Sequence, residues 1–343
     1  MDLFDTRTML DAVEQMKPAR RFLLNTFFNG ANPRTFATTS VDIDIVKGKR
    51  KMAPFVHPTL PGSVSLREGF RADTYKPPYI QPKRETTAEL ILKRSAGENP
   101  YAAKTPAQRA GERLGRDLAD LDDEITRREE WMCAQALTTG SVRVLGEGVD
   151  DTINFLMEAS HKITLSTGKW DASGSDPIGN LRQWKRGLIA KDSGRTANVG
   201  VLSGAAVDAF QANELVMKQL NTRRVDLGII KPEELPDGVT YLGYLNDPGI
   251  DLYSYDEWYL DDSGVEQPMI PDGGLILGST NTQNAMLYGA IQDLDAIESG
   301  LVEARRFPKS WVTPEPSARW LKLQAAALAG FLEPDAFVYA KVV

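Results

Sequence analysis

Apolar residues follow a helical pattern between residues 105 and 139, which is the longest regular pattern in the chain. They recur at steps of three, four or seven, so they form one stripe along an α-helix. The members of this stripe are Ala110, Leu114, Leu118, Leu121, Ile125, Met132 and Ala136. Charged residues fill most of the other positions. The pattern predicts one amphipathic helix, and we expect its packing face to include Leu114, Leu118, Leu121 and Ile125.

Both ends of this helix carry recognisable signals. Thr105 is a good N-cap, Pro106 suits the first helical position, and Gln108 completes a capping box with Thr105. Gly140 is a plausible stop, because glycine adopts the left-handed conformation that ends many helices. We therefore expect the helix to span the whole stretch without a break.

The length of this helix sets its role. At about 1.5 Å per residue it is roughly 50 Å long, whereas a compact domain of this chain length has a radius of gyration of about 20 Å. The helix is therefore interpreted as a strut that lies along a surface. The alternative is one arm of a coiled coil, which Gly111 and Gly115 disfavour because glycine weakens a helix.

Two short amphipathic helices are predicted before residue 30, over residues 5–16 and 18–28, and they must dock on other elements to be stable. A strand follows over residues 40–46, where apolar and acidic residues alternate strictly. The basic run at 47–51 comes next. It is interpreted first as a solvated turn, and alternatively as a contact to acidic groups on a neighbouring molecule.

Residues 52–94 contain many prolines, which exclude a continuous helix. Strand-like pieces at 63–67, 72–75 and 89–93 predict a long two-stranded arm with its tip near Glu68-Gly69. The arm has few large apolar side chains, so we expect it to reach outward and to be covered by another subunit. Its candidate intersubunit residues, with two from the preceding basic run, are Lys49, Arg50, Arg67, Glu68, Arg71, Lys83 and Arg84.

The rest of the chain alternates between helix and strand patterns, which predicts a mixed α/β body. Helices are predicted over 150–161, 178–191, 203–212 and 214–220. Strands are predicted over 163–166, 198–202, 274–278, 286–292 and 337–343. A hairpin is predicted over 250–270, around the turn at 261–264.

Composition restricts the class of protein. The 343 residues are 42% hydrophobic and 25% charged, as in ordinary soluble proteins. A formal net charge of -7 argues against a general nucleic-acid binder, which carries a basic face. No apolar run reaches the roughly 18 residues of a membrane helix, and the acidic start at 2–5 is unlike a signal peptide. We expect synthesis in the cytosol and no membrane contact.

Few residues are available for catalysis or metal binding. The chain has one cysteine, Cys133, and two histidines, His57 and His161, so it contains no thiolate zinc cluster and no HExxH motif. Both histidines are interpreted as surface or packing residues. Acidic residues gather between 247 and 272, but without EF-hand spacing, and a solvated acidic face is the favoured interpretation. The sequence predicts no catalytic residue, no metal and no cofactor.

Three blocks in the last third of the chain carry a resemblance to a known family. They are Pro271-Asp272 with Gly274, Ile276, Leu277 and Gly278; residues 288–293; and Arg305 with 307–309, 311–313, Pro334-Asp335 and Phe337. Matching residues elsewhere are Asn221-Thr222-Arg223-Arg224, Tyr79 and Pro82-Lys83. With the order of predicted elements, the chain resembles the lambda-type major capsid protein E family of tailed bacteriophages, which has an α+β, HK97-like fold.

This resemblance implies a virion shell subunit that is not an enzyme. Residues 1–50 would be the N-arm, 51–95 the E-loop, 96–197 the spine helix and the first part of the P-domain, 198–287 the A-domain, and 288–343 the return to the P-domain. The subunit would be made in the host bacterial cytoplasm. It would form hexamers and pentamers with itself, bind scaffolding, portal and decoration proteins, and enclose double-stranded DNA without sequence-specific binding.

Two other classes stay open from the sequence. One is a head-tail adaptor or tail-ring protein of a virion, which would also need neighbours to cover its projecting segments. The other is a carboxylate-dependent hydrolase, which would need acidic residues converging in a pocket.

Overall fold

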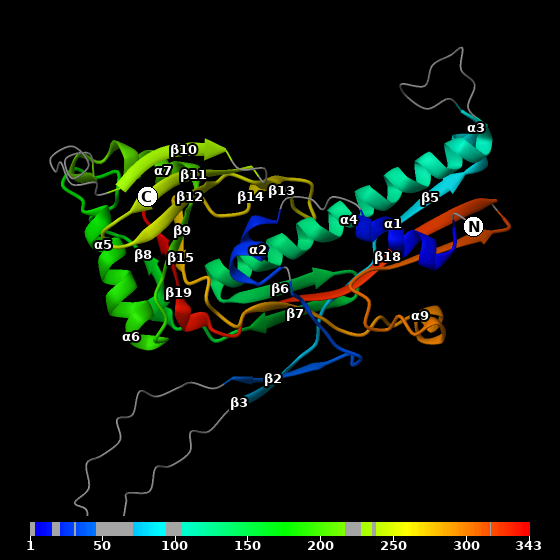
Figure 1. Cartoon of the computed structure of the whole chain (residues 1–343), viewed down its shortest axis with the longest axis horizontal. Coiled ribbons are helices and arrows are strands. Elements are labelled where there is room, and N and C mark those ends of the chain that lie inside the picture. The colour runs from blue at the N-terminus through cyan, green and yellow to red at the C-terminus, as the bar shows by residue number, and fades with distance from the viewer. Residues whose placement is uncertain are drawn as a thin grey trace, which may run out of the picture.

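The computed structural model shows an elongated body in which the long helix α4 runs from a compact lobe toward the opposite end (Figure 1). The structure describes residues 4–15, 21–30, 32–45, 71–93, 105–216, 228–234, 238–315 and 317–343. Within these ranges, only the backbone is described for residues 14–15, 43–45, 71–73 and 228–234. The predicted strand at 63–67, its tip, His57 and residues 217–220 lie outside these ranges.

Helix α4 spans Pro106–Thr139, as its sequence predicts. The Gln108 backbone N–H donates to the Thr105 hydroxyl at 3.3 Å, and the Thr105 N–H donates to the Gln108 side chain at 3.0 Å, so the capping box is complete. Gly140 ends the helix with a φ of 70°. A Cβ there would lie 2.5 Å from the Cβ of Met157, so both conformation and packing require glycine.

A six-stranded sheet lies beneath α4, built around the long strand β18 (Ala318–Gly330). On one side β18 pairs with β17 (Phe307–Thr313). Along its other edge β18 pairs in turn with β5 (Lys83–Thr87), β4 (Tyr79–Ile80) and β16 (Ala285–Tyr288). Strand β16 also pairs with β1 (Arg34–Thr35). We call α4 together with this sheet the strut.

The predicted stripe of α4 packs on this sheet. Leu114, Leu118, Leu121 and Ile125 are buried in one cluster with Leu321, Leu323 and Ala325 of β18 and with Met9 and Val13. The last two belong to α1 (Thr6–Gln15), which therefore docks on the strut as the instability of an isolated short helix requires. In helix α2 (Phe22–Phe27), all but two of the side chains are likewise buried.

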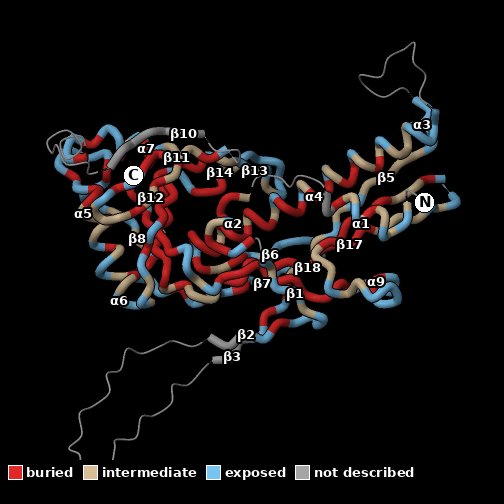
Figure 2. Tube along the Cα trace, in the orientation of Figure 1, coloured by how far each residue is buried: buried red, intermediate tan, exposed pale blue. Residues whose placement is uncertain are grey.

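The compact lobe is a seven-stranded sheet with helices packed against it, and in Figure 2 its inner strands are largely buried while its outer segments are exposed. Its strands run in the order β10 (Gly228–Glu234), β11 (Val239–Leu245), β12 (Ile250–Tyr255), β9 (Val199–Leu202), β15 (Gly274–Gly278), β19 (Phe337–Lys341) and β8 (Lys162–Thr164). Its helical segments are α5 (Pro177–Gln183), η2 (Trp184–Ile189), α6 (Ala190–Asp192) and α7 (Gly204–Ala212). Trp170 stacks on Trp184 in its core at 6.4 Å between ring centroids.

Hairpins and short helices complete the fold. The hairpins are β2 (Val41–Ile45) with β3 (Arg71–Tyr75), β6 (Ser141–Gly146) with β7 (Val149–Asn154), and β13 (Trp258–Leu260) with β14 (Glu266–Pro268). The short helices are α3 (Ala88–Leu92), η1 (Ala159–His161), α9 (Leu294–Ser299) and η3 (Pro334–Ala336). In Figure 1 the β2–β3 hairpin stands away from the body.

Three local predictions are wrong. Residues 150–161 form strand β7 and a turn of 3₁₀ helix rather than a helix, because β6 pairs with them after Gly140. Residues 89–93 belong largely to helix α3, while the strand of this region is β5. The predicted hairpin over 250–270 is confined to β13–β14, because β12 pairs with β9 and β11 in the lobe.

Candidate intersubunit surfaces and the internal frame behind them

A buried ion network fixes α4 to the segment before β17. Arg306 is 4% exposed and donates from Nε to Asp122 at 2.7 Å and from both terminal nitrogens to Glu129 at 2.7 and 3.0 Å. Glu129 is fully buried, and its pKa is lowered because the attraction of Arg306 outweighs the effect of burial. The Tyr288 hydroxyl of β16 donates to the same carboxylate at 2.9 Å. One carboxylate thus joins three segments of the strut.

Glu130, the next residue, holds the N-terminal segment and the lobe. Its carboxylate accepts backbone N–H groups of Leu23 and Leu24 at 2.7 and 3.0 Å. It also accepts the hydroxyl of Tyr255, at the end of β12, at 3.0 Å. Burial and this carboxylate raise the pKa of Tyr255 far above its ordinary value, so the phenol stays protonated and remains a donor. Glu130 therefore ties α2, α4 and the lobe together.

Arg306, Glu129 and Glu130 are absent from the sites predicted from sequence, although one signal pointed to Glu129. The apolar stripe of α4 has a seven-residue gap between Ile125 and Met132. Glu129 occupies the missing position, on the face that packs against the sheet. A carboxylate on a buried helix face requires a cation partner.

Two of the predicted intersubunit residues make contacts within the subunit. Arg84 on β5 contacts three carboxylates of α4, those of Asp117 at 3.3 Å, Asp120 at 2.5 Å and Glu124 at 3.1 Å. The Nζ of Lys83 lies 5.1 Å from the ring centroid of Trp320 on β18. Because residues 83–93 run along the strut, they do not belong to an outward arm.

Of the remaining predicted residues, Arg71 alone lies within the described part of the chain. Arg71 lies in β3, where it pairs with Ile45, and the structure describes only its backbone. Lys49, Arg50, Arg67 and Glu68 lie outside the described residues. The base of the hairpin is anchored, since Val41 and Tyr75 are buried and Tyr75 packs on Phe155 at 5.6 Å. The β2–β3 hairpin is thus fixed to the body at Val41 and Tyr75.

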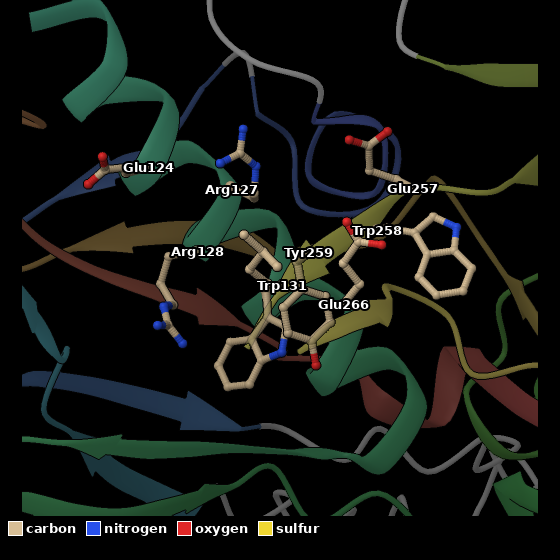
Figure 3. Close-up of a pocket in the computed structure, with 9 residues that line it drawn as sticks. Glu124, Arg127, Arg128, Trp131, Glu257, Trp258, Tyr259 and Glu266 are labelled. Atoms are coloured by element: carbon tan, nitrogen blue, oxygen red, sulfur yellow. The ribbon is translucent and has the colours of Figure 1, made fainter. Parts of the chain in front are cut away.

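A groove with exposed aromatic groups lies between α4 and the β13–β14 hairpin (Figure 3). In it, Trp131 of α4 meets Tyr259 at 6.3 Å between ring centroids, and Arg128 reaches across to Asp262 at 2.6 Å. Trp258 and Leu260 are 52% and 64% exposed although both are large and apolar. Exposed apolar groups that gather in this way mark interaction surfaces. We call this face the hairpin groove.

A second exposed apolar site is α9, which protrudes beside the strut (Figures 1 and 2). Leu294 and Ile297 are 75% and 59% exposed. The start of α9 is nevertheless rigidly held, because Asp293 accepts from Lys309 at 2.7 Å and from Gln324 at 3.1 Å. These donors lower the pKa of Asp293 to about 2.

The geometry offers no sign of catalysis among the described residues. His161 is buried, with Nδ1 2.6 Å from the Phe337 carbonyl and Nε2 3.1 Å from Asp192, so it is a packing residue. Cys133 is buried, and burial raises the pKa of its thiol. Within the same residues, neither a metal-binding group of side chains nor a helix able to span a bilayer is found.

Comparison with known proteins decides the class of this assembly of strut, lobe and projecting hairpin. The family model of phage major capsid protein E matches residues 5–342. The chain belongs to the phage major capsid protein E family. The major capsid protein of Escherichia phage lambda is 28% identical over 346 residues, 98% of each chain. That of Enterobacteria phage phi80 is 26% identical over 350 residues, all of both chains.

Solved structures confirm the fold of this capsid protein. A crystal structure titled as a capsid protein of an Escherichia coli prophage superposes with a TM-score of 0.74 at 22% identity, covering 99% of each chain. A cyanophage capsid subunit superposes with a TM-score of 0.52 at 12% identity, over 96% of this chain and 94% of that one. The α+β, HK97-like fold predicted from the resemblance is thereby confirmed. The family match over residues 5–342 confirms the predicted class, a major capsid protein that is a structural component of the virion rather than an enzyme.

Proposed function

We propose that many copies of this chain close into the icosahedral head shell that encloses double-stranded DNA, with hexamers and pentamers as its building units. The observation that carries this proposal is the match of the capsid family over residues 5–342. The physical argument is that the subunit leaves large apolar groups exposed at several separate sites. A shell supplies a neighbour for each of them.

The segment 46–70 is proposed as the E-loop that reaches a neighbouring copy. It is shorter than the predicted 51–95, because β4 and β5 pair with β18 in the strut and α3 follows β5 directly. The A-domain is proposed to be the compact lobe. It begins near residue 162 rather than at 198, since β8 and α5 contribute to the lobe, and it includes the C-terminal strand β19.

The hairpin groove is proposed as a surface that a second copy covers. Its lining carries three acidic residues, Glu124, Glu257 and Glu266, and two basic ones, Arg127 and Arg128. Glu124 also pairs with Arg84 and Arg128 with Asp262. The basic run at 47–51 leads directly from β2 into the E-loop and has the complementary charge. A neighbour's E-loop placed here would bury Trp258 and Leu260 and bring these charges together.

Scaffolding, portal and decoration proteins are proposed as further partners, on the strength of family membership alone. DNA is proposed to be enclosed without base recognition, which fits the net charge of -7.

Electron microscopy of the purified chain after assembly tests the proposal. We expect closed shells of uniform diameter. Open rings as the sole assembled form, at every protein concentration and salt tested, would instead favour the head-tail adaptor or tail-ring class.

A further inference from the structure

A cavity of about 560 Å³ lies between α1, α4 and the segment that precedes β17. Leu10 and Val13 of α1 form an apolar wall. The opposite side consists of Arg21, Arg305 and Arg306, which come from two segments far apart in the sequence. The proposed shell contacts leave this cavity unexplained.

Only one of the three arginines is fully satisfied. Arg306 uses its guanidinium on Asp122 and on both oxygens of Glu129. Glu129 also accepts from Tyr288, so little of its hydrogen-bonding capacity is left for the other two arginines. Arg305 approaches it no closer than 3.6 Å and otherwise lies 5.6 Å over the ring of Tyr288.

Arg21 and Arg305 each keep a buried donor without a partner. Among the described residues, Nη1 of Arg21 and Nε of Arg305 are buried and make no hydrogen bond. Unpaired buried donors are costly and rare in folded proteins. Burial and the repulsion of Arg305 also lower the pKa of Arg21, so the two cations lie close enough to oppose each other.

The local charge balance is positive. Three arginines face the buried carboxylates of Asp122 and Glu129, which leaves an excess of one positive charge; the other acidic residue lining the cavity, Glu303, is exposed. Residues 17 and 20, next to Arg21 in the sequence, are Lys17 and Arg20 and add to the basic character of this segment. A bound anion would offset the excess positive charge and accept from the guanidinium N–H groups that line the cavity.

We propose that Arg21 and Arg305 bind an oxyanion in this cavity and so pin the N-terminal segment to the strut. Planar guanidinium groups bind phosphate and carboxylate through paired N–H donors, which suits this ligand class. The oxyanion has two possible sources, a free inorganic anion such as phosphate or an acidic side chain from a second copy. The second source rests on the proposed shell function.

Arginine modification mapped by mass spectrometry tests this proposal and separates the sources. The purified subunit is treated with phenylglyoxal in chloride buffer and in phosphate buffer of equal ionic strength, and shells assembled without phosphate are treated likewise. Protection of Arg21 and Arg305 by phosphate in the free subunit indicates a free anion. Protection that arises only on assembly, without phosphate, indicates a carboxylate from a second copy.

Calorimetric titration of the same subunit with phosphate measures the affinity of this binding. If phosphate protects, Arg21→Gln and Arg305→Gln should each weaken binding at least tenfold, and Arg116→Gln, at an exposed position of α4, should change it less than twofold. The proposal is overturned if neither phosphate nor assembly protects the two arginines. It is equally overturned if the Gln variants bind phosphate as the parent does. Each of these results can occur while shells still form, so the shell function is judged separately.

Discussion

Helix α4 contributes to both the strut and the hairpin groove, yet the two regions differ in whether their side chains find partners within one subunit. On the strut face, Leu121 and Ile125 are at most 1% exposed, and the charges of Glu129 and Arg306 are paired inside the subunit. On the groove face, Trp258 and Leu260 are more than half exposed. Both faces contain large apolar groups, but only the first is complete in a single copy.

This difference indicates which contacts fold the subunit and which assemble it. A face whose apolar and charged groups are satisfied internally contributes to the unfolding free energy of the monomer. A face that leaves apolar groups in water gains its free energy only when a neighbour covers them. Substitutions on the strut should therefore change the unfolding free energy of the monomer, whereas substitutions in the hairpin groove should change shell assembly.

The largest effect is expected from a matched pair of substitutions, Leu121→Asp and Leu260→Asp. Leu121→Asp puts an unpaired charge in the core and removes apolar packing, so we expect a loss of about 4 kcal/mol or more and insoluble subunit. Leu260→Asp should change the unfolding free energy by less than about 0.5 kcal/mol but reduce shell yield. Soluble expression, denaturant unfolding and particle yield provide the measurements. If both substitutions lowered the stability of the monomer equally, the proposed difference between the strut and the hairpin groove would be wrong.

Arg306→Ala should destabilise the subunit by about 3–5 kcal/mol, because it leaves Glu129 buried without its cation. Urea unfolding of the purified variant measures this loss, and Arg116→Ala, at an exposed position of α4, is the control. A loss below about 1 kcal/mol would show that Glu129 does not depend on Arg306.

Asp293→Asn should cost about 2 kcal/mol at neutral pH, because the folded-state pKa of about 2 lies below the unfolded value of about 3.9. The depressed pKa means that the stabilisation is complete above about pH 4 and is lost as the pH falls toward 2. Unfolding free energies of parent and variant, measured across this range, should converge at the acidic end. A difference that does not depend on pH would refute the ionic origin.

Cys133 should show the smallest effect. Because burial raises the pKa of its thiol, the thiolate is scarce and inaccessible in the native subunit. We expect no reaction with a thiol reagent until the protein is unfolded, and Cys133→Ser should leave assembly intact. Rapid labelling of native subunit, or shells linked by disulfides, would contradict this.

The sequence predicted elements whose signals are local. The capping box at Thr105 and Gln108, the stop at Gly140 and the stripe through Leu121 depend only on neighbours along the helix, and all were correct. Residues 150–161 were mispredicted because strand β7 is stabilised by pairing with β6, which outweighs helix propensity.

Site residues were harder to predict because their partners are distant in sequence. Arg84 was predicted at an intersubunit contact, which stays a prediction, and the sequence did not reveal its three carboxylate partners 33 to 40 residues further along the chain. Arg306 and Glu129 are separated by 177 positions. Such a pair becomes visible only when β17 and α4 are placed together, although the charged residue in the apolar stripe did mark one half of it.

The central claim is that the segment 46–70 assembles the shell and is dispensable for folding the subunit. Ile45 and Arg71 are paired across the β2–β3 hairpin, so a two-residue Asn-Gly turn can replace this segment without disturbing the base. We predict a soluble variant with the parent's unfolding midpoint that forms no closed shells by electron microscopy and sedimentation. Closed shells of normal diameter and stability from this variant would contradict the account.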